Sequence, residues 1–91
     1  MFARVETFEA DPSTFEEMVD SQQHTIALAR QLPGNMGGSL LVNGDRTKAM
    51  SVTYWENEDD RTTAESEFSA APHRGTVELF SIAMQQARHA V

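Results

Sequence analysis

The sequence predicts a small α+β domain in which four strands and two helices follow one another in the order β-α-β-β-α-β. Three observations lead to this prediction. Four short stretches show the alternation of a strand, two longer ones repeat apolar residues at helical spacing, and Asn43-Gly44 is typical of a hairpin turn. A chain of 91 residues has room for one such domain, residues 1–91. Its core is expected to be thin, because chains of this length bury only roughly 60–65% of their unfolded surface.

The first half of the chain contains a predicted strand and a predicted helix. Residues 2–8 alternate as a strand does. Asp11 and Pro12 predict the start of the helix, as the N-cap and the first-turn proline. Pro33 restricts the residue before it, so the helix is expected to end near Leu32. The stripe of this helix that is expected to face the core comprises Phe15, Met18, Val19, Gln22, Ile26 and Ala29.

The second half contains three predicted strands and a second helix. Strands are expected over residues 39–42 and 48–55, joined by the Asn-Gly turn. Asn57 is expected to cap the second helix, which ends before Pro72. The last strand is expected within residues 76–84. This order is the ferredoxin-like arrangement, a four-stranded antiparallel sheet with both helices on one face.

The sheet face that the helices leave open is expected to be apolar. The third strand carries Val52 and Tyr54 on one face, and the fourth carries Leu79 and Phe80 on opposite faces, so neither face is properly polar. A second copy of the same sheet is the simplest cover, which predicts a homodimer. Thr53 and Leu79 are assigned to the face between the two copies.

Composition and charge exclude several classes of function. The net charge of −7 argues against nucleic acid as a partner, and six of the fourteen acidic residues fall between positions 56 and 67, where a solvated helix face is expected. The sequence has no signal-peptide pattern and no run apolar enough to span a membrane, so no membrane partner is expected and the cytoplasm is the default location. There is no cysteine, and His24, His73 and His89 lack metal-ligand spacing, so no metal is expected.

Three segments, taken in order, resemble a known family. They are Leu32–Leu41, with its Pro-Gly pair and short apolar strand, Val52–Asn57, a strand ending in Trp-Glu-Asn, and the closing strand Glu78–Ala83. Their order and spacing are similar to those of the antibiotic biosynthesis monooxygenase-like family of the dimeric α+β barrel superfamily. The resemblance implies homodimers whose sheets face each other. Activities in that family include cofactor-free oxygenation of aromatic polyketides and oxidative haem degradation, and other members bind small molecules.

The haem-degrading branch of the family fits this sequence poorly. That branch uses an asparagine in the first strand, a tryptophan in the second helix and an axial histidine at or after this helix. The asparagine position falls at Glu6 and the tryptophan position at Ala64, and His73 is the one candidate for the histidine. The resemblance therefore implies that haem is not the substrate, and no cofactor is expected.

Cofactor-free oxygenation needs a base and a cationic or hydrogen-bonding partner for the resulting phenolate or enolate. Arg4 and Glu6 share one face of the first strand, the face that lines the cavity in the family. Glu6 is therefore the candidate catalytic base and Arg4 its partner, with an ordinary solvated ion pair as the alternative. Tyr54, Trp55 and Phe68 are candidates for binding an aromatic substrate by stacking, with a plain core role as their alternative.

These inferences together imply a cofactor-independent monooxygenase acting on an aromatic or quinone-like small molecule. A non-catalytic small-molecule-binding or stress-response barrel is the alternative. A purely structural dimerisation module is a third reading, and it requires that side chains fill the space between helices and sheet. A pocket with polar ends on that side favours binding or catalysis over the structural reading.

Overall fold

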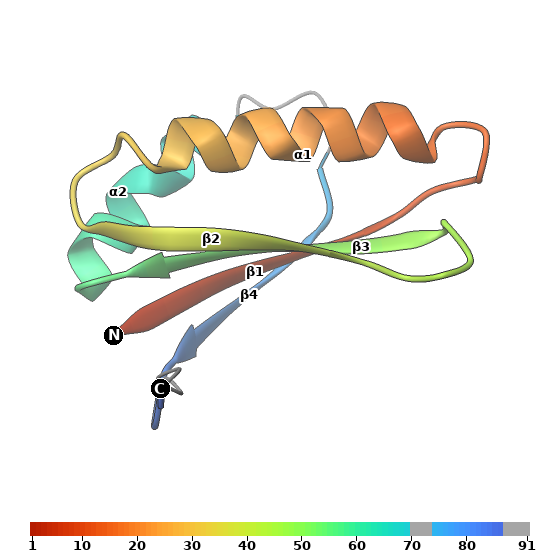
Figure 1. The fold of residues 1–91 in the computed structure, drawn as a ribbon. Helices are drawn as coiled ribbons and strands as arrows, with labels where there is room; N and C mark the ends of the chain where they lie inside the picture. The colour runs from red at the N-terminus through yellow and green to blue at the C-terminus, as the bar shows by residue number, and fades with distance from the viewer. Residues whose placement is uncertain (70–73, 87–91) are drawn as a thin grey trace, which may run out of the picture.

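The chain folds in the predicted ferredoxin-like order, as a computed structural model describes it for residues 1–69 and 74–86. The described elements are β1 (Phe2–Glu9), α1 (Phe15–Ala29), β2 (Asn35–Val42), β3 (Lys48–Trp55), α2 (Glu58–Phe68) and β4 (Thr76–Ser81). The four strands form one antiparallel sheet in the order β2-β3-β1-β4. Both helices lie on one face of it, with α1 running along the sheet (Figure 1).

The helix-facing side of the sheet holds two apolar clusters with a polar layer between them. The first cluster, near the start of α1, comprises Phe8, Phe15, Met18 and Ala49. The second, at the other end of α1 and under α2, comprises Ala29, Trp55, Ala64 and Phe68. The buried polar residues of the layer between them are Arg4, Glu6, Gln22, Ser51 and Thr53. We call this set the polar layer. Buried polar groups require partners, so this layer is where a function is to be sought.

The start of α1 differs from the prediction. The helix begins at Phe15 with Thr14 as its cap residue, three residues later than the Asp11-Pro12 signal indicates. The backbone N–H of Thr14 donates to the carbonyl of Asp11 at 3.0 Å, so Asp11 and Pro12 form a turn ahead of the helix. Helical residues end at Ala29, and a further turn in which the Leu32 N–H donates to the Ala29 carbonyl brings the chain to the predicted end.

The connection between β2 and β3 is a longer loop than the Asn-Gly pair predicts. The Asn43 side-chain oxygen accepts the backbone N–H groups of Thr47 and Lys48, each at 3.0 Å. Arg46 takes the left-handed conformation, with φ of 59°, that closes this loop. The pair therefore works through the amide of Asn43 rather than through a two-residue turn. The cap of α2 is as predicted, since the Asp60 N–H donates to the Asn57 side chain at 2.9 Å.

Thr53 and Leu79 lie on the helix-facing side of the sheet, so their assignment to the face between two copies is wrong. Both are register partners of Arg4, whose side chain contacts α2. Strand alternation gives the reason, because paired residues share a face and Thr53 has the parity of Trp55. By the same alternation, the open face carries the apolar residues Ala3, Val5, Leu41, Met50, Val52 and Phe80 together with Tyr54, and the polar residues Thr7, Glu9, Ser39, Lys48, Thr76 and Glu78. This set, which we call the open face, has an apolar part, as predicted, but it also carries hydroxyl and charged side chains.

Candidate functional site

Arg4 and Glu6 form a buried ion pair in the middle of the polar layer. Both side chains project from β1 toward the helices, and only 3% and 5% of the two residues is exposed. An Arg4 terminal nitrogen donates to Glu6 Oε1 at 2.9 Å. The pair is therefore neither solvated nor at the surface, as its alternative reading required.

The second partner of Arg4 is Glu65 of α2, which the sequence did not single out. Arg4 Nε and a terminal nitrogen donate to the two Glu65 oxygens at 2.7 and 3.0 Å, a two-pronged contact that fits a planar guanidinium. The Arg4 guanidinium also lies over the Phe68 ring, 4.3 Å from its centre. Glu65 belongs to the acidic run for which a solvated helix face is expected, but the buried residues Arg61 and Phe68, four before it and three after it, share its side of α2.

These contacts set the charge states of Arg4 and Glu65. Burial lowers the pKa of Arg4, but the hydrogen bonds to Glu65 and Glu6 outweigh it and the net pKa is raised, so the guanidinium stays charged. The hydrogen bonds from Arg4 hold the pKa of Glu65 below its usual value, against a smaller opposing effect of partial burial. Arg4 and Glu65 are therefore both charged at neutral pH.

Glu6 is held on both oxygens. Its Oε2 accepts the backbone N–H of Gly75 at 2.7 Å, just before β4, while Oε1 accepts from Arg4. Only glycine fits at position 75, since a Cβ there would lie 2.1 Å from the Thr7 carbonyl oxygen. A base that removes a proton from a substrate has to exchange one of these two hydrogen bonds for a substrate hydroxyl.

The three aromatic residues proposed to contact a substrate are not gathered in one place. Trp55 is fully buried, and its indole N–H donates to the Thr53 hydroxyl at 3.0 Å. It packs edge-to-face against Phe68, with ring centres 6.3 Å apart. Tyr54 lies on the open face, because alternation places neighbouring residues on opposite sides. The fold therefore brings Arg4, Glu6, Trp55 and Phe68 to the helix-facing side and leaves Tyr54 on the other.

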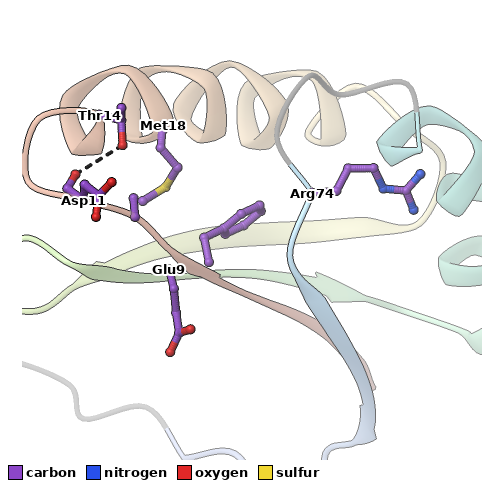
Figure 2. A pocket seen from close by; sticks show the side chains of 7 residues that line it. Glu9, Asp11, Thr14, Met18 and Arg74 are labelled. Carbon is purple, nitrogen blue, oxygen red and sulfur yellow. Dashed lines mark hydrogen bonds between the residues drawn. The ribbon is translucent and has the colours of Figure 1, made fainter.

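A hollow of about 460 Å³ opens on the helix-facing side at the end of β1 (Figure 2). Its lining residues are Phe8, Glu9, Ala10, Asp11, Thr14, Met18 and Arg74. We call it the Phe8–Met18 hollow. In Figure 2 the Met18 side chain points from α1 toward the sheet, the Glu9 carboxylate points away from α1, and the Arg74 guanidinium points away from Met18. An Arg74 terminal nitrogen donates to the Ser69 carbonyl at 3.3 Å, so the stem of this side chain lines the hollow.

The Phe8–Met18 hollow adjoins the polar layer. Phe8 follows Glu6 on the same face of β1, and Met18 lies one helical turn before Gln22 on the buried side of α1. The sequence did not single out this hollow, since its walls come from a strand end, a turn, a helix start and the segment before β4. Its volume lies within the range of small-molecule sites, and its wall combines apolar and polar groups.

Several solved structures have a similar fold. A candidate antibiotic biosynthesis monooxygenase from Deinococcus radiodurans superposes with a TM-score of 0.72 at 11% identity, covering 99% of this chain and 100% of that one. One from Nitrosomonas europaea gives 0.71 at 10% identity, with 92% and 100% covered. The chain has the antibiotic biosynthesis monooxygenase-like fold. No family model matches the sequence, and no curated protein matches it.

The haem degrader MhuD from Mycobacterium tuberculosis shares this monooxygenase-like fold, with a TM-score of 0.72 at 16% identity over 96% of this chain and 100% of that one. Its structure holds two haems in the active site. In the present chain Ala64, at the position of the family's tryptophan, is 2% exposed and packed with Trp55 and Phe68. Glu6, at the position of the asparagine, is tied to Arg4 and to Gly75. His73 lies outside the described residues. That haem is not the substrate therefore stays a prediction.

Two further findings bear on this monooxygenase-like fold. His24 is exposed, and its ring nitrogen bonds to the carbonyl of Asp20 on its own helix. Among the described residues no group of three potential metal-ligating side chains comes together, and none of the described helices is long and apolar enough to cross a membrane.

Proposed function

We propose that this protein binds a small aromatic or quinone-like molecule in the Phe8–Met18 hollow. The observation that supports the proposal is the hollow itself, which sets an aromatic ring and a thioether against a rim with Asp11 and Thr14. Phe8 and Met18 offer apolar contact to a flat ring, and sulfur–aromatic contacts are favourable. The structural likeness to candidate antibiotic biosynthesis monooxygenases supports a small organic molecule as the ligand.

The reaction that we propose is oxygenation without a bound metal or flavin. Glu6 takes a proton from the substrate, and Arg4 holds the resulting phenolate or enolate, which then reacts with molecular oxygen. For an anthrone-like substrate the CH₂ group loses both hydrogens and gains one oxygen atom as a carbonyl, and the second oxygen atom leaves as water. The buried contact between Arg4 and Glu6, next to the hollow, supports this role. Trp55 and Phe68 form the aromatic wall beyond Arg4. Tyr54 lies on the open face, so it contacts the ligand only if dimerisation brings the Tyr54 of a second copy to the site.

Non-catalytic binding is the second candidate function. Glu6 already accepts one hydrogen bond on each carboxylate oxygen, from Arg4 and from Gly75. A carboxylate in such a position stabilises the fold without taking part in a reaction. Ligand binding in the hollow does not require Glu6 to move, so a binding or stress-response protein uses the same site unchanged.

We propose that the chain acts as a homodimer in which a second copy covers the open face. Its location in the cytoplasm stays a prediction. Leu41 and Phe80 are 54% and 46% exposed on that face. Exposed apolar side chains on a sheet are typical of an association surface.

Filling the hollow tests the proposed function. Ala10 lines the hollow, so Ala10→Phe is expected to lower the affinity for 1,4-naphthoquinone at least tenfold in isothermal titration calorimetry. Ala27→Phe makes the same change on the exposed side of α1 and is expected to have no effect. Equal affinity in all three proteins contradicts the site, and no binding by the unmodified protein contradicts the function.

Catalysis is tested separately from binding. With anthrone as substrate, the unmodified protein is expected to consume oxygen in an electrode chamber, and Glu6→Gln, which keeps the shape of the side chain, is expected to lose this activity. Binding without oxygen consumption favours the non-catalytic candidate. Unchanged turnover in Glu6→Gln removes Glu6 from the mechanism.

A further inference from the structure

Gln22 has an amide group with no partner in the polar layer. The residue is 1% exposed, and its Nε2 finds no acceptor among the described residues. Buried polar groups are hydrogen-bonded in nearly all native proteins, so a buried donor without a partner points to a bound molecule that satisfies it. Gln22 occupies a position on α1 where an apolar residue would continue the stripe.

The place of Gln22 follows from its neighbours along α1. Met18, one turn earlier, packs with Ala49 in the first cluster. Ile26, one turn later, lies over β2 and β3, since a Cβ on Gly38 would lie 2.9 Å from Ile26 Cγ2 and 3.6 Å from Thr53 Cγ2. Gln22 therefore lies above the part of the sheet between Ala49 and Thr53.

That part of the sheet is polar. Ser51 lies between Ala49 and Thr53 on β3, faces the helices and is the register partner of Glu6. Gln22 thus lies over the row that contains the proposed catalytic base. A molecule that reaches this row meets a free amide donor on one side and a carboxylate on the other.

Met18 separates this row from the Phe8–Met18 hollow. Its side chain lines the hollow, belongs to the first cluster and is 2% exposed. Methionine is unbranched and has three rotatable bonds, so it changes rotamer at small cost and exposes what lies behind it. Behind Met18, one turn further along α1, is Gln22.

We propose that Gln22 Nε2 donates a hydrogen bond to an oxygen at the inner end of the ligand. This inference rests on the proposed function and names the chemical class of the group recognised, a carbonyl or phenolate oxygen on an aromatic ring. The ring lies in the hollow against Phe8 once Met18 has changed rotamer, and its oxygen points into the polar layer. Gln22 is therefore a residue for substrate recognition, whereas Arg4 holds the oxygen whose charge develops when Glu6 takes the proton.

Two probes of the same ring system separate this hydrogen bond from a contribution of shape. Naphthalene has no oxygen, and 1,4-naphthoquinone adds two carbonyl groups. Gln22→Met removes the donor and keeps the length of the side chain. It is expected to weaken the binding of 1,4-naphthoquinone about tenfold and to leave naphthalene within twofold, in calorimetric titrations at pH 7. Gln23→Met makes the same change on the exposed neighbour and is expected to alter neither affinity.

The stability of the variant gives an independent reading. Gln22→Met removes an unpartnered buried donor, so its urea midpoint is expected to equal or exceed that of the unmodified protein. Gln22→Leu repeats the test with a second apolar residue if the first variant is unfolded. Unchanged naphthoquinone affinity, or an equal loss for both probes, overturns the role of Gln22 while the proposed function stands. Failure of the unmodified protein to bind either probe overturns both.

Discussion

Replacing Arg4 by methionine is expected to destabilise the fold severely. Arg4 is 3% exposed and neutralises two carboxylates, Glu6 and Glu65. Without Arg4, Glu6 remains buried with only the Gly75 N–H as a partner. Glu65 loses less, because 43% of its side chain is exposed and it can turn to water. Removing one partner of a buried ion pair costs about 3–5 kcal/mol. The lower figure is expected here, because Glu6 keeps one hydrogen bond.

A loss of about 3 kcal/mol is large for this chain. Domains are stable by roughly 0.05–0.15 kcal/mol per residue, which amounts to about 5–14 kcal/mol for a chain of 91 residues. At about 4–8 °C per kcal/mol, the melting temperature is expected to fall by roughly 12–24 °C. Urea unfolding measures the free energy of unfolding. All variants are compared at one protein concentration, because the stability of a dimer depends on concentration. The single, fully buried Trp55 gives the fluorescence signal.

Arg46→Met is the matched control. Arg46 also pairs with a carboxylate, Glu16, and lies over an aromatic ring, that of Phe15, but both partners of the ion pair are largely exposed. Exposed pairs contribute less than about 1 kcal/mol. Combining Arg4→Met with Glu6→Leu removes the uncompensated charge and is expected to recover part of the loss. Equal effects of Arg4→Met and Arg46→Met would refute the buried-charge argument.

Three further outcomes are expected. The pKa of Glu65 is lower in the folded chain than its usual 4.5. The contribution of Glu65 to stability is therefore complete above pH 4.5 and disappears as the pH falls through the folded-state pKa. Between about pH 7 and pH 3, the urea midpoint of Glu65→Gln is expected to decline less than that of the unmodified protein. Haem is not expected to bind, and a saturable Soret shift on titration would contradict the assignment of Glu6 and Ala64. Light scattering is expected to return twice the chain mass of 10.1 kDa. Leu41→Lys or Phe80→Lys on the open face is expected to reduce the measured mass, and Leu28→Lys on α1 is expected to leave it unchanged. A monomer at micromolar concentration would contradict the dimer.

The element order was predictable because each element carries its own local signal. The alternation of apolar and polar residues predicted β1 and the bounds of β3. The Asn57 cap was predictable from the residue type of one side chain. The start of α1 was missed because the backbone carbonyl of Asp11 is used in a turn, which composition does not reveal. The faces of Thr53 and Leu79 were misassigned although strand parity determines them.

The candidate site was only partly predictable. Arg4 and Glu6 could be placed together because they are two residues apart on one strand. Their other partners, Glu65 and Gly75, come from segments about sixty to seventy positions away, and only the packing of α2 and β4 against β1 brings them close. Gln22 was counted in an apolar stripe, and its importance depends on the absence of an acceptor in the described structure rather than on its residue type.

Arg61 is expected to fix the end of β4, the strand that the helices do not cover. One Arg61 terminal nitrogen donates to the carbonyls of Ala3 and Phe80, at 3.3 and 2.9 Å, although Arg61 belongs to α2. Leu79 faces the helix side and is still 55% exposed, so apolar packing holds β4 weakly and its pairing with β1 needs other support. Arg61→Met is therefore expected to speed amide hydrogen exchange in β4 more than in β3.

The control for this experiment is Arg30→Met, which alters an exposed arginine just after α1. It is expected to leave exchange in β4 unchanged. A uniform rise of exchange over all strands in Arg61→Met would indicate a general loss of stability, and unchanged exchange in β4 would show that its pairing with β1 suffices. A selective rise at the end of β4 would place Arg61 among the residues that shape the open face, because Phe80 lies on that face beside Ala3.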